Sequence, residues 1–243
     1  MTDPWHLLQV RRRASPGSPV VTYLDLAHGQ RVELSAQSLE NAAAKIGNAL
    51  RSEFDLEAGA VVALHLPVHW QRAAWCAGVW TAGCVVAPDG DAGSADLVVT
   101  TTDRVGALIG LAGGSVAVVS LHPFGLPIED ALPVGAFDVT VAVRQQPDAY
   151  IWEPPAGALD ALRIDGTVLT QAQALESAAE RAVEWGLIDG GIMLAGEDLD
   201  PVDAWLCAVA VPLVTGGSVV LAAGGVPSDD VVDRERVTAR ARR

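Results

Sequence analysis

Short apolar runs alternate with amphipathic segments along most of the 243-residue chain. The runs "VVALHLP" (61–67) and "CVVAPD" (84–89) are too continuous for strands with one face in water, which indicates strands covered on both faces. The segment between them (69–83) predicts a helix, and "FDVTVAV" (137–143) predicts a further strand. This alternation predicts an α/β fold with open, mostly parallel sheets flanked by helices.

The same order of elements occurs twice. In each copy a strand-turn-strand segment is followed by a residue suited to cap a helix, Ser35 in the first copy and Thr170 in the second. Further on, "WTAGCVVA" (80–87) aligns with "VTGGSVVL" (214–221) at an offset of 134 residues, with the same helix end, glycine and buried strand. The repeat predicts two units related by a pseudo-twofold axis.

These units define the expected domain organisation. We expect one α/β domain over 1–226, made of related units at about 20–101 and 160–222 with a connecting segment over 102–159. The last residues, 227–243, are expected to form a C-terminal helix.

Three tryptophans occupy the predicted helix over 69–83, namely Trp70, Trp75 and Trp80. Steps of five residues place neighbouring rings about 140° apart around a helix axis. A helix with one buried face cannot cover all three. We therefore expect this helix to be sandwiched between a sheet and another layer, with an intermolecular interface as the alternative.

The formal net charge of −14 argues against nucleic acid or an anionic membrane surface as a partner, because both would be repelled. Two uncharged stretches, 105–128 and 205–226, are long enough to cross a bilayer. Each is interrupted by a Gly-Gly pair, which favours a buried helix followed by a buried strand. We expect no membrane partner.

The sequence also predicts a cytoplasmic protein. No signal peptide is recognisable at the start of the chain. The three cysteines, Cys76, Cys84 and Cys207, lie inside apolar runs, which is typical of reduced core residues and not of a disulfide framework.

The sequence gives only weak signals for a metal site or for catalytic residues. His65 and His69 have the spacing of a helical metal pair, but Pro67 and the preceding strand remove the helix. Asp89 and Asp91 lack the glutamate that completes a calcium loop and are interpreted as a turn. We predict no metal site and no catalytic residue.

Several segments in order resemble the front part of the adenylate-forming superfamily, which includes acyl-CoA synthetases, peptide-synthetase adenylation domains and luciferases. They are "VTYLDL" (21–26), the stretch from 31 to 67, "WTAGCVVAPD" (80–89), "VLTQAQALESAAE" (168–180) and "PLVTGGSVVLAAG" (212–224). The resemblance implies the N-terminal part of that fold. The chain also resembles short actinobacterial proteins of unassigned function.

The chain differs from that family in the segment that would bind the phosphates of ATP. The family has a loop of the type "TSGTTGxPKG" just before the segment that matches Thr170, whereas residues 154–166 here hold no Ser, Thr or Lys and include Asp160 and Asp165. Backbone N–H groups, hydroxyls and a cation form a phosphate cradle. We also expect the chain to end at Arg243 before the family's ribose-binding aspartate and its lid with the catalytic lysine. No ATP cofactor is predicted.

These departures favour a non-catalytic homologue that acts by binding or assembly. One alternative is half of a split acyl-activating enzyme that a second chain completes. Another is a small-molecule enzyme that uses a crevice beyond the carboxyl ends of the buried strands. The candidate residues of that crevice are His69, Asp89, Thr101, His122 and Glu197.

A homodimer is expected as well. A chain that ends within the fold leaves apolar surface, which a second copy would cover in a symmetric arrangement. At least one of the tryptophan-bearing helices is expected to lie at or just beneath the interface.

Overall fold

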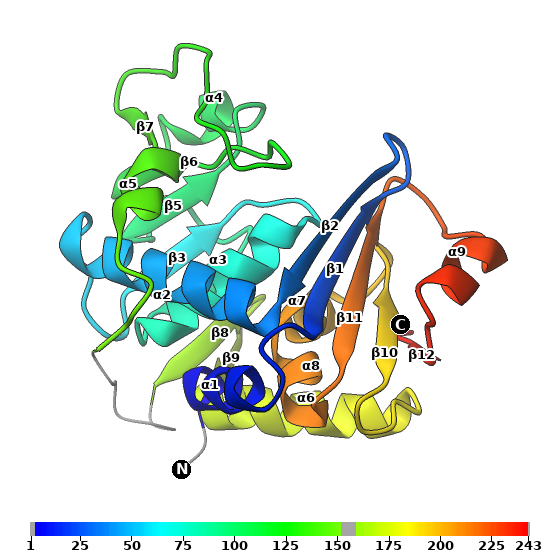
Figure 1. Cartoon of the computed structure of the whole chain (residues 1–243). Coiled ribbons are helices and arrows are strands. Elements are labelled where there is room, and N and C mark those ends of the chain that lie inside the picture. Colours follow the sequence, from blue (N-terminus) through cyan, green and yellow to red (C-terminus); the bar gives the residue numbers. More distant parts are fainter. Residues whose placement is uncertain (1–2, 152–158, 243) are drawn as a thin grey trace.

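The strands form two separate sheets in the computed structural model, which describes residues 3–151 and 159–242 (Figure 1). The larger sheet has the order β7-β6-β5-β3-β4-β8-β9, and the smaller sheet has the order β12-β10-β11-β1-β2. The strands of the larger sheet are β3 (Val61–Leu64), β4 (Val85–Pro88), β5 (Leu97–Thr100), β6 (Ser115–Val118), β7 (Ala136–Asp138), β8 (Asp160–Ile164) and β9 (Thr167–Thr170). Those of the smaller sheet are β1 (Pro19–Asp25), β2 (Gln30–Ser35), β10 (Ile192–Ala195), β11 (Ser218–Ala223) and β12 (Ala239–Arg240). The predicted α/β class with mostly parallel sheets is confirmed.

Helices surround and separate these sheets. They are α1 (Pro4–Ala14), α2 (Ala36–Ser52), α3 (Trp70–Thr81), α4 (Val105–Leu108), α5 (Val139–Gln145), α6 (Gln171–Glu184), α7 (Pro201–Ala208), α8 (Ala210–Thr215) and α9 (Asp229–Arg234). The predicted caps are confirmed, because the side chain of Ser35 accepts from the N–H of Ser38 and that of Thr170 accepts from the N–H of Gln173. Within the described ranges, no helix is long and apolar enough to cross a membrane.

Five strands of the larger sheet are arranged in the same way as the five strands of the smaller sheet. In each sheet, however, the hairpin comes from the other repeat. The β1–β2 hairpin from the first repeat pairs in parallel with β11 of the second, where Val21 lies opposite Val219. The β8–β9 hairpin from the second repeat pairs in parallel with β4 of the first, where Val86 lies opposite Leu162. Each sheet therefore contains, in this order, a flanking strand, two parallel strands and a hairpin from the other repeat. The order is β5-β3-β4-β8-β9 in the larger sheet and β12-β10-β11-β1-β2 in the smaller sheet.

Two segments differ from the sequence-based expectation. The expected strand over 137–143 is only the end of β7 followed by α5, because the Asp138 carboxylate accepts from the N–H of Thr140 at 2.8 Å and caps a helix there. The expected C-terminal helix over 227–243 is limited to α9, and β12 follows it. The left-handed backbone of Arg236, with φ of 54°, turns the chain back, so that β12 pairs in parallel with β10.

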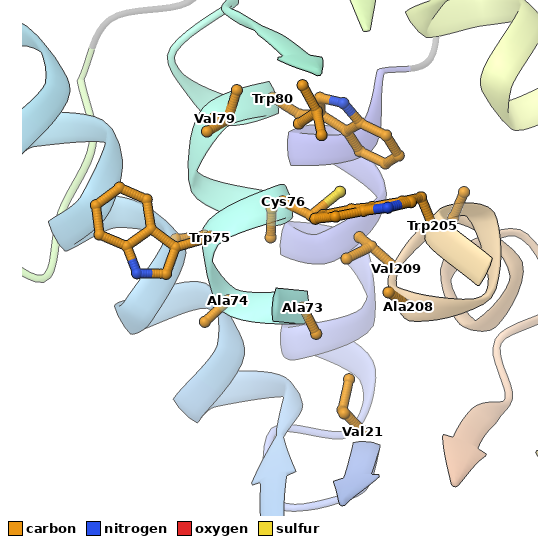
Figure 2. Close-up of a cluster of buried hydrophobic side chains, with 14 of the residues drawn as sticks. Val21, Ala73, Ala74, Trp75, Cys76, Val79, Trp80, Trp205, Ala208 and Val209 are labelled. Carbon is orange, nitrogen blue, oxygen red and sulfur yellow. The ribbon is translucent and has the colours of Figure 1, made fainter. Parts of the chain in front are cut away.

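The core has α3 at its centre. Trp75 and Trp80 are only 2% and 1% exposed, and they point in opposite directions, with Trp205 of α7 on the Trp80 side (Figure 2). The Trp80 indole donates to the carbonyl of Ala161 at 2.6 Å and so connects α3 to β8. The sandwiched arrangement is confirmed. These rings offer no surface to a second copy, and the homodimer stays a prediction.

Helices α2 and α3 approach closely at Gly78. A Cβ at this position would lie 2.4 Å from Cγ2 of Ile46, so any larger residue would force the helices apart. Helix α5 packs on α2, and the side chain of Gln71 in α3 donates to the carbonyl of Ser120 in the loop after β6.

Candidate functional site

A cleft of about 290 Å³ lies where the carboxyl ends of β4 and β10 approach each other. Its wall includes Asp89, which follows β4, Glu197, which follows β10, and Asp165 in the turn between β8 and β9. Arg72 of α3 and Trp205 of α7 complete it. Residues from both repeats thus meet beyond the ends of parallel strands, the position where open α/β sheets commonly bind ligands.

Asp89 is held by two basic side chains. Its carboxylate pairs with Arg104 at 3.0 Å and with Nδ1 of His65 at 3.4 Å. The hydrogen bond from His65 is the largest of the effects that hold the pKa of Asp89 below its usual range, although burial acts in the other direction. The backbone of Asp89 is left-handed, with φ of 44°, which turns the chain sharply after β4. Asp89 is therefore a fixed carboxylate at the cleft wall.

Arg72 is the cation of the cleft, and structural contacts occupy much of it. Its Nη2 donates to the carbonyl of Leu66 at 2.8 Å, and its guanidinium lies 4.7 Å from the centre of the Trp205 ring. Burial lowers the pKa of Arg72, whereas Asp89 and Glu197 act to raise it. An arginine stacked on an aromatic ring and bonded to a carbonyl holds α3 against α7.

The other two carboxylates of the cleft are exposed, as that of Asp89 is. Glu197 accepts a hydrogen bond from the N–H of Gly224 at 3.2 Å, which ties the end of β10 to the end of β11. Asp165 and Gly166 both have positive φ, 46° and 81°, as a two-residue hairpin turn of the primed type requires. The turn carries the Asp165 carboxylate to the cleft.

His69 does not line the cleft and is instead the N-cap of α3. Its Nδ1 accepts from the N–H of Gln71 at 3.2 Å, and its ring contacts Tyr23 with centroids 4.5 Å apart. Burial lowers the pKa of His69 to about 4, against a smaller opposite effect of Asp25. A neutral ring agrees with its role as a hydrogen-bond acceptor, so His69 acts as a structural cap.

The last two candidates lie elsewhere. Thr101 is buried after β5 and donates to the carboxylate of Asp103. His122 is exposed in the loop after β6, where its Nδ1 accepts from the N–H of Phe124. Of the five predicted residues, the structure brings Asp89 and Glu197 together in one cleft.

Sequence reasoning missed Arg72, Asp165 and Trp205 as parts of this wall. The Asp-Gly pair at 165–166 signals a hairpin turn, but nothing local indicates that the turn reaches β4. Arg72 lies in α3, beyond the carboxyl end of β3, which is a region where open α/β sheets commonly contact ligands. The contact between Arg72 and Trp205 depends on how α3 packs on α7 and has no sequence signal.

Within the described residues, the three thiols are buried and the metal-ligating residue types form no cluster of three. Burial raises the pKa of all three thiols, that of Cys84 to about 12, which disfavours a thiolate at each of them. All three cysteines are buried, which agrees with the core positions that the sequence predicts. Within residues 3–151 and 159–242, no group of three or more His, Cys, Asp or Glu side chains is placed to hold a metal ion. Of the region that the resemblance aligns with the phosphate loop, 154–158 lie outside the described residues, and 159–166 form β8 and its turn.

Comparison with known proteins identifies both a relative and a fold. The chain is 37% identical over 237 residues to a "TIGR03089 family protein" of Mycobacterium tuberculosis, and the match covers 94% of each protein. No protein-family model matches the chain.

Solved structures share the fold. An acyl-CoA synthetase of Brucella canis matches with a TM-score of 0.80 and 22% identity over 98% of this chain and 47% of that protein. The N-terminal domain of FACL13 from Mycobacterium tuberculosis matches with a TM-score of 0.72 and 15% identity over 98% of this chain and 62% of that domain. The chain thus spans about half the length of the acyl-CoA synthetase that it matches.

Proposed function

Because this chain belongs to the TIGR03089 family and shares the fold of the N-terminal part of acyl-CoA synthetases, we propose that it is a non-catalytic homologue that acts by binding. The observation that carries the proposal is the charge of the strand-end cleft. Three carboxylates, those of Asp89, Asp165 and Glu197, line it together with one arginine. Such a cleft disfavours a nucleoside triphosphate, whose phosphates would lie beside like charges.

The cations near the cleft do not offset these carboxylates. Arg72 is bonded to Leu66 and stacked on Trp205, and Arg104 is paired with Asp89. The chain has a single lysine, Lys45, whose ammonium donates to the carbonyl of Gln146 at 2.6 Å and lines a different cavity. Phosphoryl and adenylyl transfer depend on cations and N–H groups aimed at the phosphates, so this arrangement supports binding without adenylation.

Titration calorimetry with MgATP, together with exchange of labelled pyrophosphate into ATP, tests the proposal. We expect no heat of binding at sub-millimolar ATP and no exchange with acyl substrates, while a full-length acyl-CoA synthetase serves as the positive control. In the double variant Asp165→Asn, Glu197→Gln we expect any weak ATP binding to increase, because two like charges are removed. ATP binding by the unaltered chain at sub-millimolar concentration would show that the cleft accepts a triphosphate.

A second candidate function is half of an acyl-activating enzyme that another polypeptide completes. It is supported by the extent of the fold match, which covers 47% of the acyl-CoA synthetase. The same calorimetry distinguishes the two functions when it is repeated with proteins that copurify with the chain. ATP binding that arises only in the complex would favour the completed enzyme.

A further inference from the structure

We propose that a second cavity, on the other side of α3, binds a small amphiphilic anion, meaning an apolar body with one negatively charged head group. The cavity measures about 260 Å³ and lies between α2, α3, α5 and the loop after β6. Figure 1 shows α2, α3 and α5 grouped on the same side of the larger sheet. The inference does not depend on the chemistry of the strand-end cleft.

The walls of this cavity are apolar. They are formed mainly by Ile46, Trp70, Trp75, Val119, Val139 and Val143. Small-molecule sites are typically concave and apolar, with a few polar groups that fix the orientation of the ligand. The volume lies just below the roughly 300–1,000 Å³ of sites for drug-sized ligands, which selects a ligand of about the size of a hexyl chain with a head group.

The charged groups of the cavity are both cationic. Lys45 and Arg144 line it, and among the described residues no Asp or Glu does. This is unusual in a chain with a formal net charge of −14. It is also the reverse of the strand-end cleft, where carboxylates predominate. A positive group beside an apolar wall favours an apolar anion over a cation or a neutral alcohol of equal size.

The two cations have different roles. Lys45 donates to the carbonyls of Arg144 and Gln146 and pairs with Asp148 at 2.9 Å, so it secures the end of α5. Nη1 of Arg144 donates to the carbonyl of Gly125 over 3.5 Å, a long contact. Among the described residues this guanidinium makes no other hydrogen bond, so most of its five N–H donors can meet a ligand. Arg144 is therefore the group that meets the head group.

Phe124 adds an exposed aromatic ring to this cavity. Its side chain lines the cavity and yet is 84% exposed. Its ring lies 5.8 Å from that of His122, on the same loop. A ligand body in the cavity would cover part of this aromatic ring and remove apolar surface from water.

Three matched probes test the inference: hexyl sulfate, hexanol and hexyltrimethylammonium. They share the apolar chain and differ in charge. Amide chemical shifts measured during each titration report both affinity and location. We expect hexyl sulfate to bind most tightly and to shift amides of α2, α5 and residues 121–126, with at least about tenfold weaker binding of the cationic probe.

Variants separate the contribution of charge from that of shape. Arg144→Gln is expected to weaken hexyl sulfate about tenfold and leave hexanol unchanged, while Arg144→Lys recovers part of the loss. Ala42→Phe, on the α2 wall, is expected to abolish binding of all three probes, and Thr140→Phe on α5 replaces it if that variant does not fold. Equal binding of the cationic probe, or shifts confined to the strand-end cleft, would overturn the inference.

Discussion

The two sides of α3 have opposite chemistry. On one side, the strand-end cleft carries Asp89 and Glu197 at the ends of parallel strands. On the other side, the cavity has apolar walls with Arg144 at its margin. Trp70 faces the cavity and Arg72, two residues later, faces the cleft, as expected for positions about 200° apart on a helix. One helix therefore separates two hollows whose charged lining residues are of opposite sign.

The packing on the two sides differs as well. On the cleft side, Trp205 is 2% exposed and lies beneath the Arg72 guanidinium. On the cavity side, Trp70 is partly exposed because the cavity leaves part of its surroundings empty. Trp75 also lines the cavity but is only 2% exposed, so the loose packing on this side is confined to the surroundings of Trp70.

The largest expected effect follows from this difference. Trp205→Ala should lower the free energy of unfolding by about 3–5 kcal/mol, since it removes a buried indole and leaves a cavity. Trp70→Ala should cost about 1–2 kcal/mol, because its ring already contacts water and less apolar area is lost. Urea denaturation of both variants at the same pH measures the two losses in the free energy of unfolding. Equal losses would show that the two sides of α3 are packed alike.

An intermediate effect is expected from His69, which lies between the two regions and contacts both Tyr23 and Trp70. Burial lowers its pKa from 6.5 to about 4, so below pH 6.5 the unfolded chain takes up a proton that the folded chain does not. Stability should therefore fall by about 2 kcal/mol between pH 7 and pH 5.

The control is His69→Asn, which keeps a side-chain acceptor at the N-cap and does not titrate. Urea midpoints across this pH range should be nearly constant in the variant and should decline in the unaltered protein. A decline of the same slope in both proteins would assign the pH dependence to other groups.

The smallest effect is expected at the rim of the cleft. Arg104 and Asp89 form an ion pair whose side chains are 44% and 58% exposed, so water and salt screen their attraction. Arg104→Gln should change the free energy of unfolding by about 0.5 kcal/mol or less. Thermal unfolding at low and high salt provides the measurement. A loss of several kcal/mol would mean that this pair holds the cleft together.

Much of the local structure is predictable from the sequence. Ser35 and Thr170 cap helices because the cap bond reaches only three residues along the chain. The spacing of Trp75 and Trp80 requires apolar cover on more than one side of their helix, and the continuous apolar run at 61–67 requires a covered strand. Each of these signals acts over a few residues, so the order of residues suffices to define it.

Only the tertiary structure decided how these elements meet. The repeat predicts two similar units, but it does not indicate that β1 pairs with β11 or that β8 pairs with β4. Likewise, Asp138 ends a strand and caps α5 where β-branched residues favour a longer strand. Asp89 and Glu197 line one cleft although more than a hundred residues separate them. The partner of each strand and the assembly of the cleft depend on which surfaces of the chain can be buried together. No short segment contains that information, so only the complete fold decides both.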